Sequence, residues 1–195
     1  MTADPWMRYA AIVLIARLMG EEKNPLGKTA LQKLTHLAQE LWKCPLEYHF
    51  RLYNYGPYSR QLALSQDYLE SIHGLDVEYD PDQGYSILPG RTAGDLERRG
   101  KAFLSKWAKP LDRLVKEFGS YQAWQLEIIA TIVFVDRDHA KRSRSFVSLE
   151  TLAEEVAEIK PRHDREYIAR LVGILNEAGH LRSTSHTQPK RPRKG

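Results

Sequence analysis

The chain has 195 residues, of which 42% are hydrophobic and 28% are charged, and its formal net charge is +4. This is the composition of an ordinary globular protein, and the longest apolar run is too short to span a bilayer. Cys44 is the only cysteine, which excludes an internal disulfide and argues against a zinc site built from thiolates. We therefore expect a cytoplasmic protein with neither a membrane segment nor a secretory signal.

The excess positive charge lies at the C-terminal end. Residues 182–195 hold five basic residues and no acidic one, which leaves a net charge of −1 for the rest of the chain. Because the last residues offer almost nothing apolar to bury, we predict a disordered basic tail over residues 185–195. Two interpretations stay open, a solvated end or an arm that binds phosphates through Lys190, Arg191, Arg193 and Lys194.

The first part of the chain predicts two helices and a strand. Residues 5–19 form a broadly apolar helix, and residues 29–42 have apolar side chains at three- and four-residue steps, with Thr29 placed to cap that helix. Pro45 then interrupts helical hydrogen bonding. From residue 46 to residue 53, apolar and polar residues alternate, which predicts a half-buried strand.

A third helix and a hairpin are predicted next. Gly56 and Pro57 are expected to turn the chain, and Ser59 is placed to cap a helix that Gly74 ends. Residues 76–88 contain two short runs on either side of a turn-forming cluster, which predicts a small hairpin.

Two motifs in this region resemble a known family. The helix sequence Lys28-Thr29-Ala30-Leu31-Gln32-Lys33-Leu34 is followed by Phe50-Arg51-Leu52-Tyr53-Asn54-Tyr55-Gly56-Pro57-Tyr58-Ser59. This pairing resembles the YwgA-like proteins and the related Panacea domain of SocA-like antitoxins, over roughly the first 90 residues. The resemblance implies a fold similar to a winged helix and, for the Panacea relatives, neutralisation of diverse toxins. It assigns no catalytic residue.

The order of the elements is also that of a winged helix-turn-helix, in which the hairpin is the wing. A long helix is predicted next, and three helices after it, two of them with Ser148 and Asp164 placed as caps, repeat the order of the first half. The expected fold is therefore mainly α with small β hairpins. It comprises winged-helix-like units at residues 1–91 and 120–184, joined by a connecting helix at residues 92–119.

No pattern in the sequence indicates catalysis. The seven histidines are scattered without the spacing of a metal site, and no serine has the context of a nucleophile turn. We expect a protein that is not an enzyme and that needs no cofactor or metal.

Two sets of residues are candidate binding surfaces. A basic loop, the start and polar face of the last predicted helix, and the tail could contact duplex DNA. An aromatic segment around the Gly-Pro-Tyr-Ser motif could bind a protein partner, although aromatic residues at such a turn also serve packing. The DNA candidates are Arg137, Lys141, Arg142, Arg144, Arg162, His163, Arg165, Arg170 and the four basic tail residues, and the partner candidates are Arg51, Tyr53, Tyr55, Gly56, Pro57, Tyr58, Ser59 and Arg60.

Two functions follow from these surfaces. The leading hypothesis is a non-enzymatic regulator that binds DNA or acts like an antitoxin, the latter as the resemblance implies, in a prokaryotic toxin–antitoxin or defence setting. The alternative is a protein-interaction module that recognises a toxin or effector without nucleic acid. The basic loop and tail favour DNA, whereas the nearly neutral body favours a protein partner. A homodimer is a further open alternative.

Overall fold

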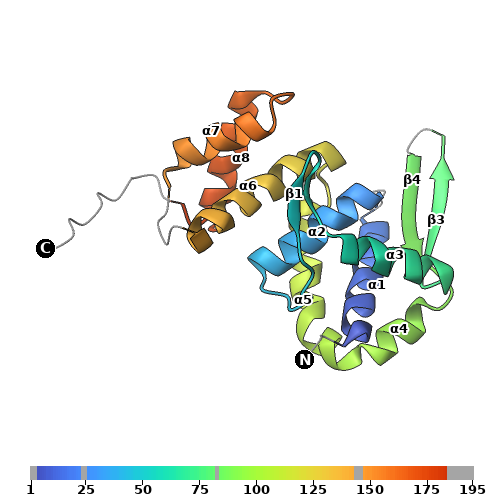
Figure 1. The fold of residues 1–195 in the computed structure, drawn as a ribbon. Helices are drawn as coiled ribbons and strands as arrows, with labels where there is room; N and C mark the ends of the chain where they lie inside the picture. Colours follow the sequence, from blue (N-terminus) through green and yellow to red (C-terminus); the bar gives the residue numbers. More distant parts are fainter. Residues whose placement is uncertain (1–3, 23–25, 82–83, 143–146, 184–195) are drawn as a thin grey trace, which may run out of the picture. The chain divides into compact units, whose positions relative to one another are not determined.

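The computed structural model describes residues 4–22, 26–81, 84–142 and 147–183, and the chain divides into compact units at residues 1–130 and 131–195. Within the described residues there are eight α-helices and two antiparallel β hairpins (Figure 1). The expectation of a mainly helical protein with small hairpins is confirmed. None of the described helices is long and apolar enough to cross a membrane. The predicted tail at residues 185–195 lies outside the described residues.

Helix α1 (Pro5–Glu21) is the central element of the first unit. The Asp4 side chain accepts a hydrogen bond from the backbone N–H of Trp6, and Pro5 occupies the first turn, where a missing N–H costs nothing. Four of the helices that follow it in the chain, and one strand, contact α1. The helix is therefore apolar on nearly all sides, with the buried residues Ala10, Ala11, Ile12, Val13, Ile15, Ala16 and Met19.

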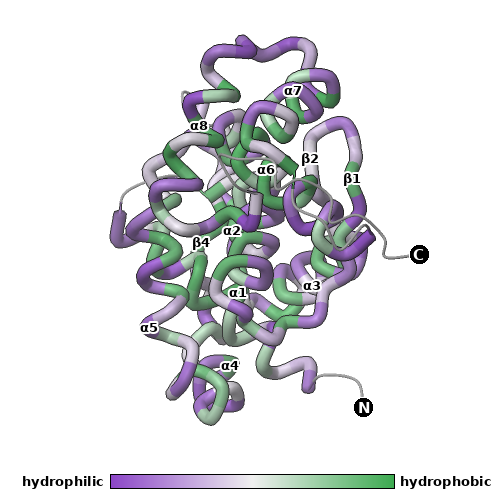
Figure 2. Tube along the Cα trace, turned by 90° about the vertical axis from the view of Figure 1, so that its left-hand side faces the viewer, coloured by the Kyte–Doolittle hydropathy of each residue, from purple (hydrophilic) through white to green (hydrophobic). Residues whose placement is uncertain are grey.

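Helix α2 (Lys28–Leu41) begins one residue earlier than the sequence suggests. Its N-cap is Gly27, so the prediction that Thr29 caps this helix is wrong. The apolar face is buried as expected, but four polar residues are buried with it. Figure 2 shows hydrophobic and hydrophilic stretches alternating along the helices, as expected of helices with one buried face.

The segment after α2 is extended for only part of the predicted length. Residues 46–50 follow the expected alternation of burial but belong to no strand, and regular pairing begins at β1 (Arg51–Tyr53). Strand β1 pairs with β2 (Gly56–Tyr58), in which Pro57 lies opposite Leu52. Asn54 and Tyr55 form the turn, so the prediction that the chain turns at Gly56 and Pro57 is wrong.

Helix α3 (Arg60–Ser71) follows at once, with the Ser59 hydroxyl accepting from the backbone N–H of Leu62 as the sequence predicts. Strands β3 (Leu75–Asp80) and β4 (Gly84–Pro89) then form the predicted second hairpin. The backbone N–H of Ile87 donates to the carbonyl oxygen of Leu26 at 2.9 Å, which fixes β4 to the loop before α2.

The predicted long helix at residues 92–118 is two helices, α4 (Ala93–Arg99) and α5 (Lys101–Phe118). They meet at Gly100, and both pack on α1. Pro110 lies inside α5 without dividing it. Gly100 allows this arrangement because a Cβ there would overlap the Cβ of Ala10 on α1.

The second unit contains the C-terminal part of α6 (Ala123–Arg142), then α7 (Leu149–Ile159) and α8 (Arg165–Glu177). Ser148 and Asp164 cap α7 and α8, as predicted from the sequence. Asp136 on α6 accepts from the backbone N–H groups of Arg182 and Ser183 at 2.8–3.1 Å. The chain after α8 is thereby fixed to α6, and within the described residues no strand follows α8.

The contact between α1 and Gly100 provides a stability test. We expect Gly100→Ala to lower the free energy of unfolding by about 1–3 kcal/mol, because the added methyl group overpacks the close approach to Ala10. Gly94→Ala, on α4 with only the flexible Arg98 side chain nearby, should be neutral or stabilising by up to about 1 kcal/mol. Chemical denaturation of both variants measures the difference, and equal stabilities would contradict the packing account.

Candidate functional site

Two adjacent side chains of α2 hold strand β2 in place. The Gln32 side-chain amide donates to the carbonyl oxygen of Ser59 at 3.1 Å and accepts from the Ser59 backbone N–H at 2.9 Å. The Lys33 ammonium donates to the carbonyl oxygen of Pro57 at 2.8 Å. Both side chains are almost fully buried. The two sequence motifs that carry the family resemblance therefore contact each other directly.

A second glutamine of α2 makes the same kind of contact further along. The Gln39 amide accepts from the backbone N–H of Tyr48 at 2.8 Å and donates to the Tyr48 carbonyl oxygen at 3.1 Å. Arg8 of α1 adds a bond to the carbonyl oxygen of Leu46 at 2.6 Å. Because buried backbone groups must be hydrogen-bonded, these side chains act in place of a neighbouring strand for residues 46–50.

The hairpin depends on a left-handed backbone conformation at the first residue of strand β2. Gly56 has φ of +81°, a conformation that costs about 1–2 kcal/mol for residues with a Cβ. The ring centroids of Tyr53 and Tyr58 lie 5.7 Å apart in an edge-on arrangement across the hairpin. The glycine thus lets the strands reverse tightly while both tyrosines stay on the same side.

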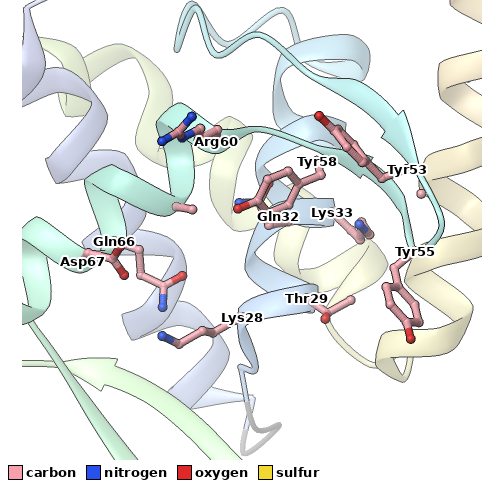
Figure 3. Close-up of a pocket in the computed structure, with 12 residues that line it drawn as sticks. Lys28, Thr29, Gln32, Lys33, Tyr53, Tyr55, Tyr58, Arg60, Gln66 and Asp67 are labelled. Carbon is pink, nitrogen blue, oxygen red and sulfur yellow. The ribbon is translucent and has the colours of Figure 1, made fainter.

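A groove of about 690 Å³ lies between α2, α3 and this hairpin. Figure 3 shows the α2 residues lying between the tyrosines of the hairpin and the polar residues of α3. The volume of the groove is typical of ligand-binding clefts, which are on the order of 300–1,000 Å³. It is lined by Lys28, Thr29, Gln32, Lys33, Tyr53, Tyr55, Gly56, Tyr58, Arg60, Ala63, Gln66 and Asp67.

Exposed aromatic side chains form one wall of this groove. Tyr55 is 70% exposed, Tyr53 57% and Tyr58 38%. Tyrosine combines a large apolar ring with a hydroxyl group and is enriched in protein interfaces. The three tyrosines of this short hairpin therefore present ring surface and hydroxyl groups to solvent.

The charges in the groove are mainly positive. Lys28, Lys33 and Arg60 line it, against the single carboxylate of Asp67. Glu70, on α3, lies 3.5 Å from Lys28 and also accepts from Gln66 at 2.7 Å. The acidic groups of α3 thus lie toward the Lys28 end of the groove.

The partner candidates fall into three groups. Five of them line the groove: Tyr53, Tyr55, Gly56, Tyr58 and Arg60. Pro57 and Ser59 are buried and bind α2 through their backbone, and Arg51 is exposed on β1 outside the groove lining. The lining residues that sequence reasoning missed all lie on α2 and α3, namely Lys28, Thr29, Gln32, Lys33, Ala63, Gln66 and Asp67. The Lys28–Lys33 motif is the signal that could have found the first four.

The basic candidates of the second unit are not all available to DNA. Arg137 is buried, pairs with the Asp136 carboxylate and donates to the carbonyl oxygen of His180 at 2.7 Å. The prediction that Arg137 contacts DNA is therefore not supported, because its guanidinium is buried and bonded to Asp136 and His180. Lys141 is exposed, and Arg142 is exposed but lies 3.0 Å from Asp138 one turn earlier.

The remaining basic candidates flank α8. Arg162, Arg165 and Arg170 are exposed and His163 is partly buried. Arg165 lines a shallow depression of about 380 Å³ between α7 and α8 together with Glu150, Glu154 and Glu166. Three carboxylates around one guanidinium oppose phosphate binding at that point. Arg144, Lys190, Arg191, Arg193 and Lys194 lie outside the described residues.

Comparisons with known proteins place the chain in no family. Neither the scan against protein-family models nor the search of curated proteins finds a significant match. Among the described residues, no group of three or more histidine, cysteine, aspartate or glutamate side chains is arranged to hold a metal ion.

The contact of Gln32 with Ser59 can be tested by truncation. We expect Gln32→Ala to lower the free energy of unfolding by on the order of 3 kcal/mol, because it leaves a buried N–H and a buried C=O of Ser59 without their partner. Gln61→Ala is the matched control, since Gln61 accepts one exposed backbone bond from His49 and should cost less than about 1 kcal/mol. Thermal unfolding of both variants measures the difference. A loss for Gln32→Ala no larger than for Gln61→Ala would show that the Gln32–Ser59 contact does not hold the groove together.

Proposed function

We propose that this chain is a non-enzymatic regulatory protein that binds a segment of a toxin or effector protein in the groove between α2, α3 and the β1–β2 hairpin. The observation that carries the proposal is the set of exposed tyrosines on a hairpin whose position is fixed by buried side-chain hydrogen bonds. A surface that is already ordered loses little conformational entropy on binding. The sequence resemblance to antitoxin-related proteins supports the same role.

A fold similar to a winged helix is part of this proposal. The order of three helices followed by the β3–β4 hairpin supports it. Residues 42–59 separate α2 from α3, however, where a helix-turn-helix has a turn of about three or four residues. This insertion supplies the hairpin that forms one wall of the groove, so the departure from the usual motif coincides with the proposed binding surface.

Charge in the first unit favours a protein over DNA. Strand β3 has the exposed acidic residues Asp76, Glu78 and Asp80, and residues 75–89 contain no lysine or arginine. The exposed side chains of α3 include Leu64, Asp67 and Tyr68. A wing and helix of this composition would repel phosphates, whereas exposed Leu and Tyr side chains suit contact with a protein.

We also propose a cytoplasmic location. Cys44 is buried, and burial raises the pKa of its thiol to about 12, so the thiol is protected from oxidation by the fold. A chain with a single cysteine, which has no second cysteine for an internal disulfide, fits a reducing compartment.

Partner binding can be measured with the protein encoded by a neighbouring gene. We expect Tyr55→Ser to weaken its binding at least about ten-fold, since truncation of an aromatic anchor commonly costs more than 1 kcal/mol. Tyr79→Ser is the control, because Tyr79 is 65% exposed on the other hairpin. Calorimetry measures the affinities, and both variants should unfold at the same temperature as the natural protein. If the two variants bind the partner with equal affinity, the groove is not the binding site.

A second candidate function is duplex DNA binding by the second unit. The exposed Arg162 just before α8 and the exposed Arg170 on it support this alternative. It predicts salt-dependent binding to mixed-sequence duplex that weakens about uniformly across sequences in Arg162→Ala and Arg170→Ala. Fluorescence anisotropy at low salt measures it, and unchanged binding in both variants would exclude a role for α8.

A further inference from the structure

The groove and the rest of the first unit differ in their charge. Three basic residues and one acidic residue line the groove, whereas the neighbouring strand β3 exposes only acidic side chains among its charged residues. A partner segment with several carboxylates would be attracted to the groove and repelled by the β3–β4 hairpin. Opposite charges of this kind fix where and in which orientation a partner docks.

The polar groups of the groove are mainly hydrogen-bond donors. Lys28 and Arg60 carry only donors, and the hydroxyl groups of Thr29 and the tyrosines can donate as well. Lys28 and Thr29 are also the first two residues of α2, whose N-cap is a glycine without a side chain to cap the helix. The positive end of the α2 dipole therefore lies beside the groove and adds to the attraction for carboxylates.

Lys33 is the third basic residue of the groove lining. Its side chain is 2% exposed, and its terminal nitrogen donates to the carbonyl oxygen of Pro57 at 2.8 Å. Lys33 therefore holds the hairpin against α2, and the exposed Lys28 and Arg60 are the basic residues that a carboxylate in the groove can contact.

We infer that the groove selects an acidic segment of the partner protein, in which carboxylates contact the Lys28 and Arg60 side chains and an apolar or aromatic residue packs on Tyr53 and Tyr55. This inference rests on the proposed function and specifies the chemistry of the ligand. The acidic β3 strand and Asp67 disfavour a nucleic acid at this site, because a phosphate backbone has no stretch without negative charge.

A titration with defined polymers tests the inference. The full chain, labelled with ¹⁵N, is titrated with a random copolymer of glutamate and tyrosine, and separately with the matched copolymer of lysine and tyrosine. We expect the acidic copolymer to shift the amide signals of Tyr55, Gly56, Tyr58 and Arg60, and the basic copolymer to leave them in place. Arg60→Glu should weaken binding of the acidic copolymer at least about ten-fold. Arg91→Glu, at an exposed arginine outside the groove lining, should change it less than about two-fold.

Three outcomes would overturn the inference. They are equal shifts with the basic copolymer, equal affinity of Arg60→Glu and Arg91→Glu, and shifts of the same amides by mixed-sequence duplex DNA. The comparison of Tyr55→Ser with Tyr79→Ser on the natural partner is independent of ligand charge. If that comparison succeeds while the copolymers fail, the groove binds a partner but does not select for acidic residues.

Discussion

Ser59 is the point at which the three walls of the groove are joined. Its backbone N–H and C=O both bond to the Gln32 amide of α2, and its hydroxyl accepts from the N–H of Leu62 in the first turn of α3. The residue also directly follows strand β2. The direction in which α3 leaves the hairpin is thus set relative to α2 by one residue whose polar groups are all used in the interior. The hydrogen bonds of this junction thus set the spacing between the tyrosines of the hairpin and the basic residues of α2 and α3.

In both units, polar side chains on a helix hydrogen-bond to the backbone groups of another segment. In a β-sheet a neighbouring strand has this role. In the first unit Gln32 and Gln39, seven residues apart and about two helical turns from each other, each pair with both backbone groups of one residue. In the second unit the Asp136 carboxylate accepts from two successive N–H groups and from the Ser183 hydroxyl at 2.7 Å. Arg137 balances the charge of Asp136, which would otherwise be costly to bury.

Much of the local structure was predictable because it depends on signals close in sequence. The caps at Ser59, Ser148 and Asp164 and the hairpin at residues 75–89 all follow from turn and capping chemistry, and the structure confirms them. The turn at Asn54 and Tyr55 was missed because Gly56 and Pro57 are strong turn formers. Here they form a short strand, in which Pro57 occupies a position that tolerates a residue without an N–H.

The groove could be predicted only in part. The hairpin residues were found because tyrosines beside a Gly-Pro pair are conspicuous, but the α2 and α3 residues were not. Gln32 and Lys33 have the composition of a solvated helix face, and only the path of residues 42–59 over α2 buries them. That path depends on contacts between residues distant in sequence, which periodicity cannot report. For the same reason, the burial of Arg137 could not be predicted: the basic sequence after residue 136 suggested a loop, whereas α6 continues to Arg142.

The Gln32–Ser59 contact constrains its two partners very differently. Glutamine suits this position on α2, because its side chain ends in a donor and an acceptor and can pair with both backbone groups. At position 59 the pairing uses backbone atoms that every residue except proline possesses, so serine is favoured there by its burial and by the hydroxyl that caps α3, and not by the pairing itself. Substitutions at the two positions would then vary independently among descendants of this protein. Methods that detect contacts from correlated substitutions would therefore miss the contact that joins the walls of the groove.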